Sequence, residues 1–307
     1  MTPAIEVRQL TKCYGALAAL DTVDLQIEQG EFFALLGSNG AGKTTLISIL
    51  AGLVKPTSGT AKVMGYDVQS QYQQTRKRLG VVPQELVYDP FFSVREMLIM
   101  QSGYFGIKHN DAWVDEVLFR LDLANKAHTN LRALSGGMKR RVLIAQALVH
   151  KPPVIILDEP TAGVDVDLRQ SLWQFVQQLN QEGHTVVLTT HYLEEAEALC
   201  NRVAMLKRGQ VVVLDNINNL VRATRDYTLL LRLSVNTLPD KLQSWPVRHD
   251  PVGGLYRISI QEYTEIETIL SLLREADIQI IDLHLQQPDL EDVFVRTMEE
   301  MDRAAVP

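Results

Sequence analysis

Residues 37–45, GSNGAGKTT, have the types and spacing of a phosphate-binding loop. The glycines let backbone N–H groups approach phosphate oxygens, and Lys43 would place a positive charge beside them. The Thr44 hydroxyl is suited to bind Mg²⁺. Apolar runs on both sides predict a strand, the loop and a helix. An ordinary glycine turn is the alternative. The loop residues expected to contact the phosphates are Gly37, Ser38, Asn39, Gly40, Ala41, Gly42, Lys43, Thr44 and Thr45.

Two adjacent carboxylates, Asp158 and Glu159, follow the apolar residues 154–157. Beside a phosphate site, Asp158 would hold Mg²⁺, and Glu159 would orient and deprotonate the attacking water. A strand that ends in a solvated acidic turn is the alternative interpretation. The pair is therefore a candidate hydrolytic site only because the phosphate loop accompanies it.

Three further candidate site residues stand outside any motif, and a single residue indicates a role less specifically than a motif does. Gln84 follows the apolar residues 79–82, where its amide would reach both the metal and the attacking water. His191 follows the apolar strand at 185–190 and would donate a hydrogen bond to the γ-phosphate, unless it is a capping or core histidine. Tyr14, in a predicted loop, would stack on a base or simply pack.

A second glycine-containing segment, LSGGMKRR at residues 134–141, precedes an apolar helical run. A helix N-terminus carries unpaired N–H groups and partial positive charge, so cations in its first turn are unfavourable unless an anion lies opposite. We therefore expect Lys139, Arg140 and Arg141 to lie near a polyphosphate. A solvated basic patch is the alternative.

The elements that must position these residues follow from periodicity. Strands are predicted at 5–10, 23–28, 60–65, 79–83, 154–158, 185–190, 202–207 and 210–214, and helices at 93–104, 111–122, 137–149, 166–180 and 191–199. The strands at 154–158 and 185–190 are almost wholly apolar, which predicts a parallel core sheet covered on both faces. After residue 218 the predicted order is strand, helix, strand, strand, helix, strand and a final helix. This order is the split βαβ of ferredoxin-like domains.

Composition narrows the classes of protein. The 307 residues carry a net charge of −7, which gives no overall basic footprint for nucleic acid. The two cysteines, Cys13 and Cys200, are too few for a metal site or a disulfide framework and fit a reducing compartment. No run of eighteen apolar residues and no secretory signal is present, so we expect a chain that does not itself span a membrane.

The motifs together resemble those of an ABC-type ATPase domain from Tyr14 to His191. The resemblance rests on their order and spacing: Tyr14, the loop at 37–44, Gln84, LSGGM at 134–138, VIILDEP at 154–160, AGVD at 162–165 and His191. It implies an α/β P-loop fold with a helical subdomain at residues 1–218. The order of strands and helices after it predicts a small α+β accessory or regulatory domain at 219–307. The cofactors that the resemblance implies are ATP and Mg²⁺, with Thr44, Gln84 and Asp158 at the metal and Glu159, His191 and Gln84 in catalysis.

The resemblance also implies a partner for LSGGMKRR. In this family two ATPase domains pack head to tail, and the LSGG helix of one closes over the ATP of the other. Two copies of this chain would then form a homodimer. The residues that would contact ATP or the interface in trans are Ser135, Gly136, Gly137 and Asp165. Ser38 stands where many members have proline, and Met138, where many have glutamine, resembles exporter-type members.

The expected function is the motor of an exporter, at the cytoplasmic face of the membrane beneath a separately encoded integral membrane permease. The residues between Gln84 and Ser135 would receive a helix of that partner, and their aromatic residues Tyr88, Phe91, Phe92, Tyr104 and Phe105 would line the groove or pack in the core. The C-terminal QPDLEDVF, residues 287–294, resembles the ending of ATPases of two-component drug and polysaccharide exporters.

Two other functions remain as alternatives. The first is a non-transport ABC ATPase acting on DNA or ribosomes. Gln84 and Leu134 are only 50 positions apart, which is too few for the coiled-coil arms of repair members, and translation members carry two ATPase units. The second, a metabolic P-loop kinase, would leave LSGGM and AGVD as coincidences. Because the chain is acidic and has no room for such arms, no nucleic-acid partner is expected.

Overall fold

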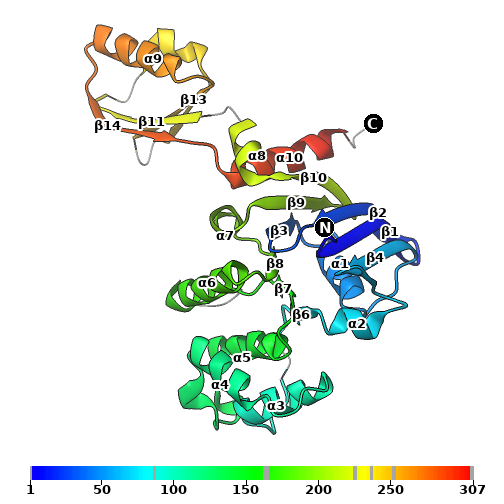
Figure 1. The fold of residues 1–307 in the computed structure, drawn as a ribbon. Coiled ribbons are helices and arrows are strands. Elements are labelled where there is room, and N and C mark those ends of the chain that lie inside the picture. Colours follow the sequence, from blue (N-terminus) through cyan, green and yellow to red (C-terminus); the bar gives the residue numbers. More distant parts are fainter. Residues whose placement is uncertain are drawn as a thin grey trace. The chain divides into compact units, whose positions relative to one another are not determined.

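The computed structural model describes residues 2–85, 88–161, 166–223, 227–235, 238–250 and 254–304 (Figure 1). The chain divides into two compact units, Met1–Asp215 and Asn216–Pro307. This division lies close to the boundary after residue 218 that the sequence predicts. No helix in the described ranges is both long and apolar enough to cross a lipid bilayer.

The first unit is built on a six-stranded sheet with the order β10-β9-β3-β8-β7-β6. The pairs β3–β8, β3–β9, β6–β7 and β7–β8 are parallel, as predicted. Every residue of β7 and of β8 is buried, because helices cover both faces of the sheet. The strands are β3 Phe32–Gly37, β6 Leu79–Val82, β7 Val154–Asp158, β8 Thr185–Thr189, β9 Arg202–Lys207 and β10 Gln210–Asn216.

The register of this sheet brings the candidate residues to one edge. Asp158 is paired with Thr189, which is also the partner of Leu35 near the end of β3, and Val82 is paired with Leu157. The carboxyl ends of β3, β6, β7 and β8 therefore lie side by side. In open parallel sheets this edge is where ligands bind.

A second sheet, antiparallel, has the order β2-β1-β4-β5. Its strands are β1 Ile5–Tyr14, β2 Leu17–Ile27, β4 Ser58–Val63 and β5 Tyr66–Asp67. The first two strands are longer than predicted and reach the turn between them, so Tyr14 is the last residue of β1 and not a loop residue. One hydrophobic cluster joins both sheets to helix α1, through Leu46 and Ile49 among others.

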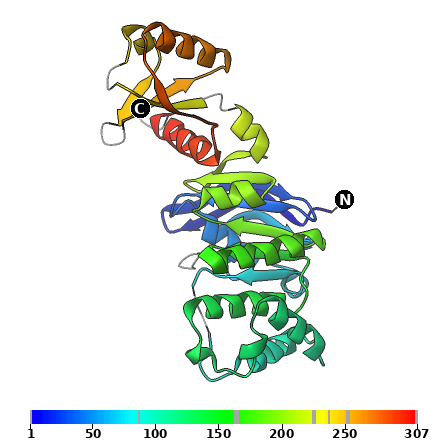
Figure 2. The ribbon, with the colours of Figure 1, turned by 90° about the vertical axis from the view of Figure 1, so that its left-hand side faces the viewer.

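The helices of the first unit are α1 Lys43–Leu50, α2 Tyr72–Arg76, α3 Val94–Tyr104, α4 Asp111–Arg120, α5 Gly136–Leu148, α6 Val166–Gln181 and α7 Leu193–Leu199, with 3₁₀ turns η1 Ala124–Lys126 and η2 Leu131–Ala133. Helix α3 begins with a capping box, in which Ser93 and Glu96 satisfy each other's backbone N–H groups. Helices α3, α4 and α5 gather beyond the edge strand β6, as the two views of the ribbon show (Figures 1 and 2). They form the expected helical subdomain.

The second unit contains a four-stranded antiparallel sheet with the order β12-β13-β11-β14. Strand β13 separates β11 from β12, and β11 separates β13 from β14, which is the predicted split βαβ arrangement. Leu229, Ile258, Ile269 and Leu273 belong to the core beneath α9. The predicted first helix is only a 3₁₀ turn. The elements are α8 Ile217–Ala223, β11 Tyr227–Leu233, η3 Asp240–Ser244, β12 Val247–Asp250, β13 Leu255–Ile260, α9 Thr264–Glu275, β14 Ile280–Gln286 and α10 Leu290–Ala304.

Candidate functional site

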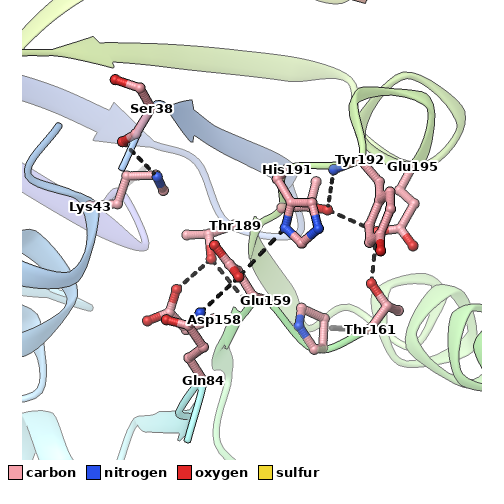
Figure 3. A network of polar contacts seen from close by, with 12 residues as sticks. Ser38, Lys43, Gln84, Asp158, Glu159, Thr161, Thr189, His191, Tyr192 and Glu195 are labelled. Atoms are coloured by element: carbon pink, nitrogen blue, oxygen red, sulfur yellow. Dashed lines mark hydrogen bonds and ion pairs between the residues drawn. The ribbon is translucent and has the colours of Figure 1, made fainter. Parts of the chain in front are cut away.

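The phosphate-binding loop joins β3 to α1, as the sequence predicts. Gly42 has φ 111°, and a Cβ there would lie 2.6 Å from the carbonyl oxygen of Ala19, so only glycine fits. Residues 38–40 are exposed. The Lys43 Nζ donates to the carbonyl oxygens of Gly37, at 2.6 Å, and Ser38, at 3.2 Å (Figure 3). The loop therefore holds its lysine amine on the side where the candidate acids lie.

Lys43 is only 8% exposed, and its charge is balanced by nearby carboxylates. Burial lowers the pKa of Lys43, and the negative charges of Glu159 and Asp158 oppose the shift. The amine, the loop and the acids thus belong to one electrostatic site. A triphosphate supplies the anions that such a loop and lysine are suited to bind.

Asp158 ends β7 and is 5% exposed. The Thr189 hydroxyl donates to its Oδ1 at 2.5 Å. Burial raises the pKa of Asp158, and this hydrogen bond opposes the shift. Thr189 is the residue paired with Asp158 in the neighbouring strand, so the sheet register itself orients the carboxylate.

The oxygen atoms at this edge fit Mg²⁺. Carboxylate, hydroxyl and amide oxygens are the ligands that this cation prefers, with the remainder supplied by phosphates and water. Gln84 donates through Nε2 to Glu159, which leaves its amide oxygen available to a cation, and Thr44 is exposed at the start of α1. Among the described residues, no group of three or more His, Cys, Asp or Glu side chains is arranged for a metal. A dedicated all-protein cage is not how proteins usually bind Mg²⁺.

Glu159 lies at the centre of the candidate hydrolytic residues. Its Oε2 accepts a hydrogen bond from Gln84 Nε2 at 2.9 Å and is 3.5 Å from His191 Nδ1. Its side chain is 13% exposed and that of His191 is 54% exposed, so the histidine is not a core residue. The structure therefore brings together Gln84, Glu159 and His191, which are far apart in the sequence (Figure 3).

The backbone of Glu159 is held in an uncommon conformation, with φ 46°. A left-handed non-glycine residue costs about 1–3 kcal/mol and persists only where its surroundings impose it. Here the N–H of Glu159 donates to both the carbonyl oxygen and the hydroxyl of Thr189, at 3.1 and 3.0 Å. Thr189 therefore positions both acidic residues.

Behind His191, a buried carboxylate organises the segment that carries the histidine. Glu195 is 6% exposed and accepts hydrogen bonds from the hydroxyls of Thr161, at 3.1 Å, and Thr190, at 2.9 Å (Figure 3). The indole of Trp173 donates to its other oxygen at 3.3 Å, and Arg169 lies 3.6 Å from that same oxygen. Glu195 thus ties the segment after β7 to the segment after β8.

Helix α5 begins at the LSGG segment. The Ser135 side chain is its N-cap and accepts from the N–H of Met138, at 3.3 Å. No acidic residue occupies the first turn, and Ser135 and Gly136 are exposed. A helix N-terminus of this kind suits an anion. The predicted partner nucleotide would meet it there.

The expectation that the three cations after LSGGM serve a polyphosphate is wrong for Arg140 and Arg141. Arg140 is 4% exposed and binds backbone carbonyl groups of its own chain. Arg141 donates to the carbonyl oxygen of Leu121 at 3.1 Å and to Asp122 at 3.0 Å. Lys139 is half-buried, and its amine lies 4.5 Å from the ring centroid of Tyr88.

Tyr14 and Asp165 are the remaining predicted site residues, and the structure describes only the first. Tyr14 is 49% exposed and lies beside Lys12, whose amine is 4.7 Å from the ring centroid. The strand partner of Tyr14 is Leu17 in β2. Two residues further along β2, the carbonyl oxygen of Ala19 borders Gly42 of the phosphate loop. Tyr14 therefore belongs to the hairpin that lies next to this loop. Asp165, with the rest of AGVD at 162–165, lies outside the described residues.

Sequence reasoning assigned no role to Thr189, Glu195 or Arg140 in positioning the site. The burial of Arg140 could have been predicted from the sequence. The residues after Arg141 are apolar at nearly every position, which predicts a helix covered on all sides. A cation in such a helix must find its acceptors inside the protein. Thr189 and Glu195 had no comparable signal, because their partners depend on strand register and helix packing.

Comparisons with known proteins agree with this geometry. The family model described as ABC transporter matches residues 20–162. The linearmycin resistance ATP-binding protein LnrL of Bacillus subtilis is 33% identical over 302 residues, covering 95% of this chain and 97% of that protein. The Nod factor export ATP-binding protein I of Cupriavidus metallidurans is 36% identical over 308 residues, covering 96% and 97%.

Solved structures resemble about 70% of this chain. The ATP-binding cassette MJ0796, a dimer in a post-hydrolysis state bound to ADP and Pi, gives a TM-score of 0.64 at 28% identity, covering 69% of this chain and 98% of that one. An ATP-binding subunit of an ABC transporter gives a TM-score of 0.67 at 27% identity, covering 72% and 92%. This chain therefore belongs to the ABC transporter family and is one of its ATP-binding, ATP-hydrolysing subunits.

Proposed function

We propose that two copies of this chain form the motor of an exporter and drive a separately encoded integral membrane protein. The observation that carries the proposal is the exposed start of α5 at Ser135, in a chain whose sequence contains one P-loop. This helix end suits the phosphates of a nucleotide that a second copy holds. The dimeric state of MJ0796 supports the assembly, and the name of the Nod factor export relative supports export.

In this proposal each nucleotide lies between two copies. One copy holds the triphosphate with the P-loop residues Gly37 to Thr45, and Tyr14 stacks on the base. The partner copy contributes the hydroxyl of Ser135 and the N–H groups of Gly136 and Gly137, and Asp165 lies across the interface. Such a dimer is two-fold symmetric, so one kind of chain completes both sites.

Thr44, Gln84 and Asp158 would hold Mg²⁺, which would supply positive charge beside the phosphates of the nucleotide. Lys43 would exchange its present acceptors, the carbonyl oxygens of Gly37 and Ser38, for phosphate oxygens. Thr189 keeps the buried carboxylate of Asp158 oriented before the nucleotide arrives. These residues are therefore arranged to bind a nucleoside triphosphate tightly.

Hydrolysis requires a base beside the γ-phosphate. The Glu159 carboxylate would take a proton from the attacking water, because the hydrogen bond from Gln84 fixes one of its oxygens and leaves the other for the water. His191, half exposed beside that carboxylate, would donate a hydrogen bond to the γ-phosphate. The division of roles depends on the left-handed backbone of Glu159, which sets its side-chain direction.

The membrane partner would dock between α2, α3 and α5. Two hollows of 350 and 580 Å³ occur there, and they share Arg76, Gln101 and Phe105 in their walls. Tyr104, 74% exposed, lines the larger hollow. We call the two hollows together the coupling groove. Of the predicted aromatic residues, only Tyr104 and Phe105 line it. The motor would thus act from the cytoplasmic face of the membrane.

The proposal is tested by the solution mass of purified Glu159→Gln protein with and without ATP and Mg²⁺. We expect the mass to double with ATP, and Ser135→Arg in the same background to stay at the monomer mass. Because the P-loop of the Ser135→Arg protein is intact, it should still bind a fluorescent ATP analogue, which serves as the folding control. A Glu159→Gln protein that binds the analogue but stays monomeric would contradict the shared site.

A further inference from the structure

Arg140 is a buried arginine whose hydrogen bonds are all accounted for. It is 4% exposed, and a guanidinium group has five N–H donors that must find partners when water is excluded. The structure supplies five backbone carbonyl oxygens. They are those of Pro160 for Nε, at 2.9 Å; Pro83 and Gln84 for Nη1, at 2.6 and 2.9 Å; and Asp158 and Glu159 for Nη2, at 2.9 and 2.5 Å.

These five carbonyl groups belong to two segments that are distant in the sequence. One carries Gln84 and the other carries Asp158 and Glu159. The fork of the guanidinium group therefore holds the backbone of the amide donor and the backbone of its carboxylate acceptor in one rigid arrangement. The 2.9 Å hydrogen bond from Gln84 to Glu159 persists during movements of the chain only if the backbones of both residues are held in place.

Arg140 also belongs to the helix that starts at LSGG. It lies about one and a half helical turns after Ser135, and an α-helix transmits displacement along its axis over so short a distance. An anion bound at the start of α5 would pull on this first turn. Any shift of the turn relative to the sheet moves the guanidinium group and, with it, the two segments it binds.

We infer that Arg140 is a positioning residue that couples the two ATP sites. Docking of α5 on the nucleotide of the partner copy sets the geometry of Gln84 and Glu159 in the chain's own site. The inference rests on the proposed shared-site dimer and assigns its regulation to one side chain. Arg140 touches no nucleotide in this scheme; it acts through the carbonyl groups it holds.

Arg141 provides a matched control, because it is the adjacent arginine of the same helix. Its guanidinium group donates to Leu121 and Asp122 in the helical subdomain and to neither catalytic segment. Lysine keeps the charge at either position but has three donors and no planar fork. Arg140→Lys therefore cannot hold all five carbonyl groups, whereas Arg141→Lys can still pair with Asp122.

The first measurement is steady-state ATPase kinetics of the wild type and both lysine variants. We expect Arg140→Lys to lower kcat about 10²-fold with little change in KM, because small displacements of catalytic groups cost about that much. Arg141→Lys should stay close to the wild type. Arg140→Gln is measured in parallel, so a folding defect in one variant leaves the comparison intact. Equal kcat values for the folded Arg140 and Arg141 variants would overturn the inference.

The second measurement does not depend on activity. In the Glu159→Gln background, hydrogen–deuterium exchange of amides in residues 79–85 is recorded with and without ATP and Mg²⁺, together with solution mass. We expect ATP to double the mass in every variant, but to slow exchange in this segment only where Arg140 is present. Slowed exchange in the Arg140→Lys dimer would overturn the inference, whereas failure of the parent background to dimerise would instead overturn the proposed function.

Discussion

Gln84 Nε2 donates a hydrogen bond to Glu159 Oε2 at 2.9 Å, across 75 positions of the chain. The contact joins the end of an edge strand to the end of its parallel neighbour, where β6 and β7 are in register. An amide donor that holds one carboxylate oxygen restricts the rotation of the carboxylate and leaves its other oxygen free of this contact. The proposed base is thus oriented before any nucleotide is present.

Glu159→Gln should abolish turnover and retain nucleotide binding. The amide oxygen still accepts from Gln84, so the local geometry persists, but it cannot take a proton from water. Loss of a general base costs about 10²–10⁴-fold in rate. Phosphate release under single-turnover conditions, with binding measured by a fluorescent ATP analogue, checks this. Turnover near the wild-type rate would show that the base is another group.

Lys43→Ala should weaken ATP binding by at least about tenfold, because a charge-assisted hydrogen bond of 1.5–3 kcal/mol is lost. Calorimetric titration with ATP and Mg²⁺ measures the effect. Lys62→Ala is the control, since this lysine is 42% exposed and pairs with Glu6 on the antiparallel sheet. Equal affinities for the two variants would remove Lys43 from the site.

Glu195→Ala should destabilise the first unit by about 1–3 kcal/mol, because the buried hydroxyls of Thr161 and Thr190 lose their acceptor and the partly buried Arg169 loses its carboxylate partner. Urea unfolding monitored by circular dichroism gives the free energy of unfolding. Glu194→Ala is the control, because Glu194 is exposed in the same helical turn. A change below about 0.5 kcal/mol for Glu195→Ala, the range of ordinary surface substitutions, would contradict the described network.

His150 should make unfolding pH-dependent. Its Nε2 lies 3.2 Å from the carbonyl oxygen of Leu79 and its ring stacks on Phe105, while Nδ1 is buried without a partner. Burial lowers the pKa of His150 from 6.5 to about 4. The unfolded chain therefore binds a proton more readily than the folded chain does.

The stabilisation from neutral His150 is thus complete above pH 6.5 and declines as the pH falls towards 4, by up to about 3 kcal/mol. We expect the free energy of unfolding of His150→Gln to fall less steeply over this interval than that of the wild type. Urea titrations at pH 7, 6, 5 and 4.5 compare the two. Parallel curves would mean that the ring titrates alike in both states.

The sequence by itself determined the class of site and most of the elements. The glycine loop, the acidic pair after an apolar strand and the single-residue motifs have fixed spacing, so they could be recognised without coordinates. Helices α3 to α7 end within two residues of the predicted positions, because their apolar periodicity is strong, whereas α2 was not predicted. The ferredoxin-like order of the second unit followed from the alternation of strands and helices, although its first helix is a 3₁₀ turn.

Only the tertiary structure decided what each polar side chain does. The sequence placed Arg140 and Arg141 with a partner's phosphates, because charge at a helix start is a local property. Arg140 instead binds carbonyl groups from positions 83–84 and 158–160, which reach it through sheet register and helix packing. Thr189 and Glu195 are ordinary in sequence for the same reason. Their partners are distant along the chain, and local patterns do not encode which distant backbone or side chain will share a buried space.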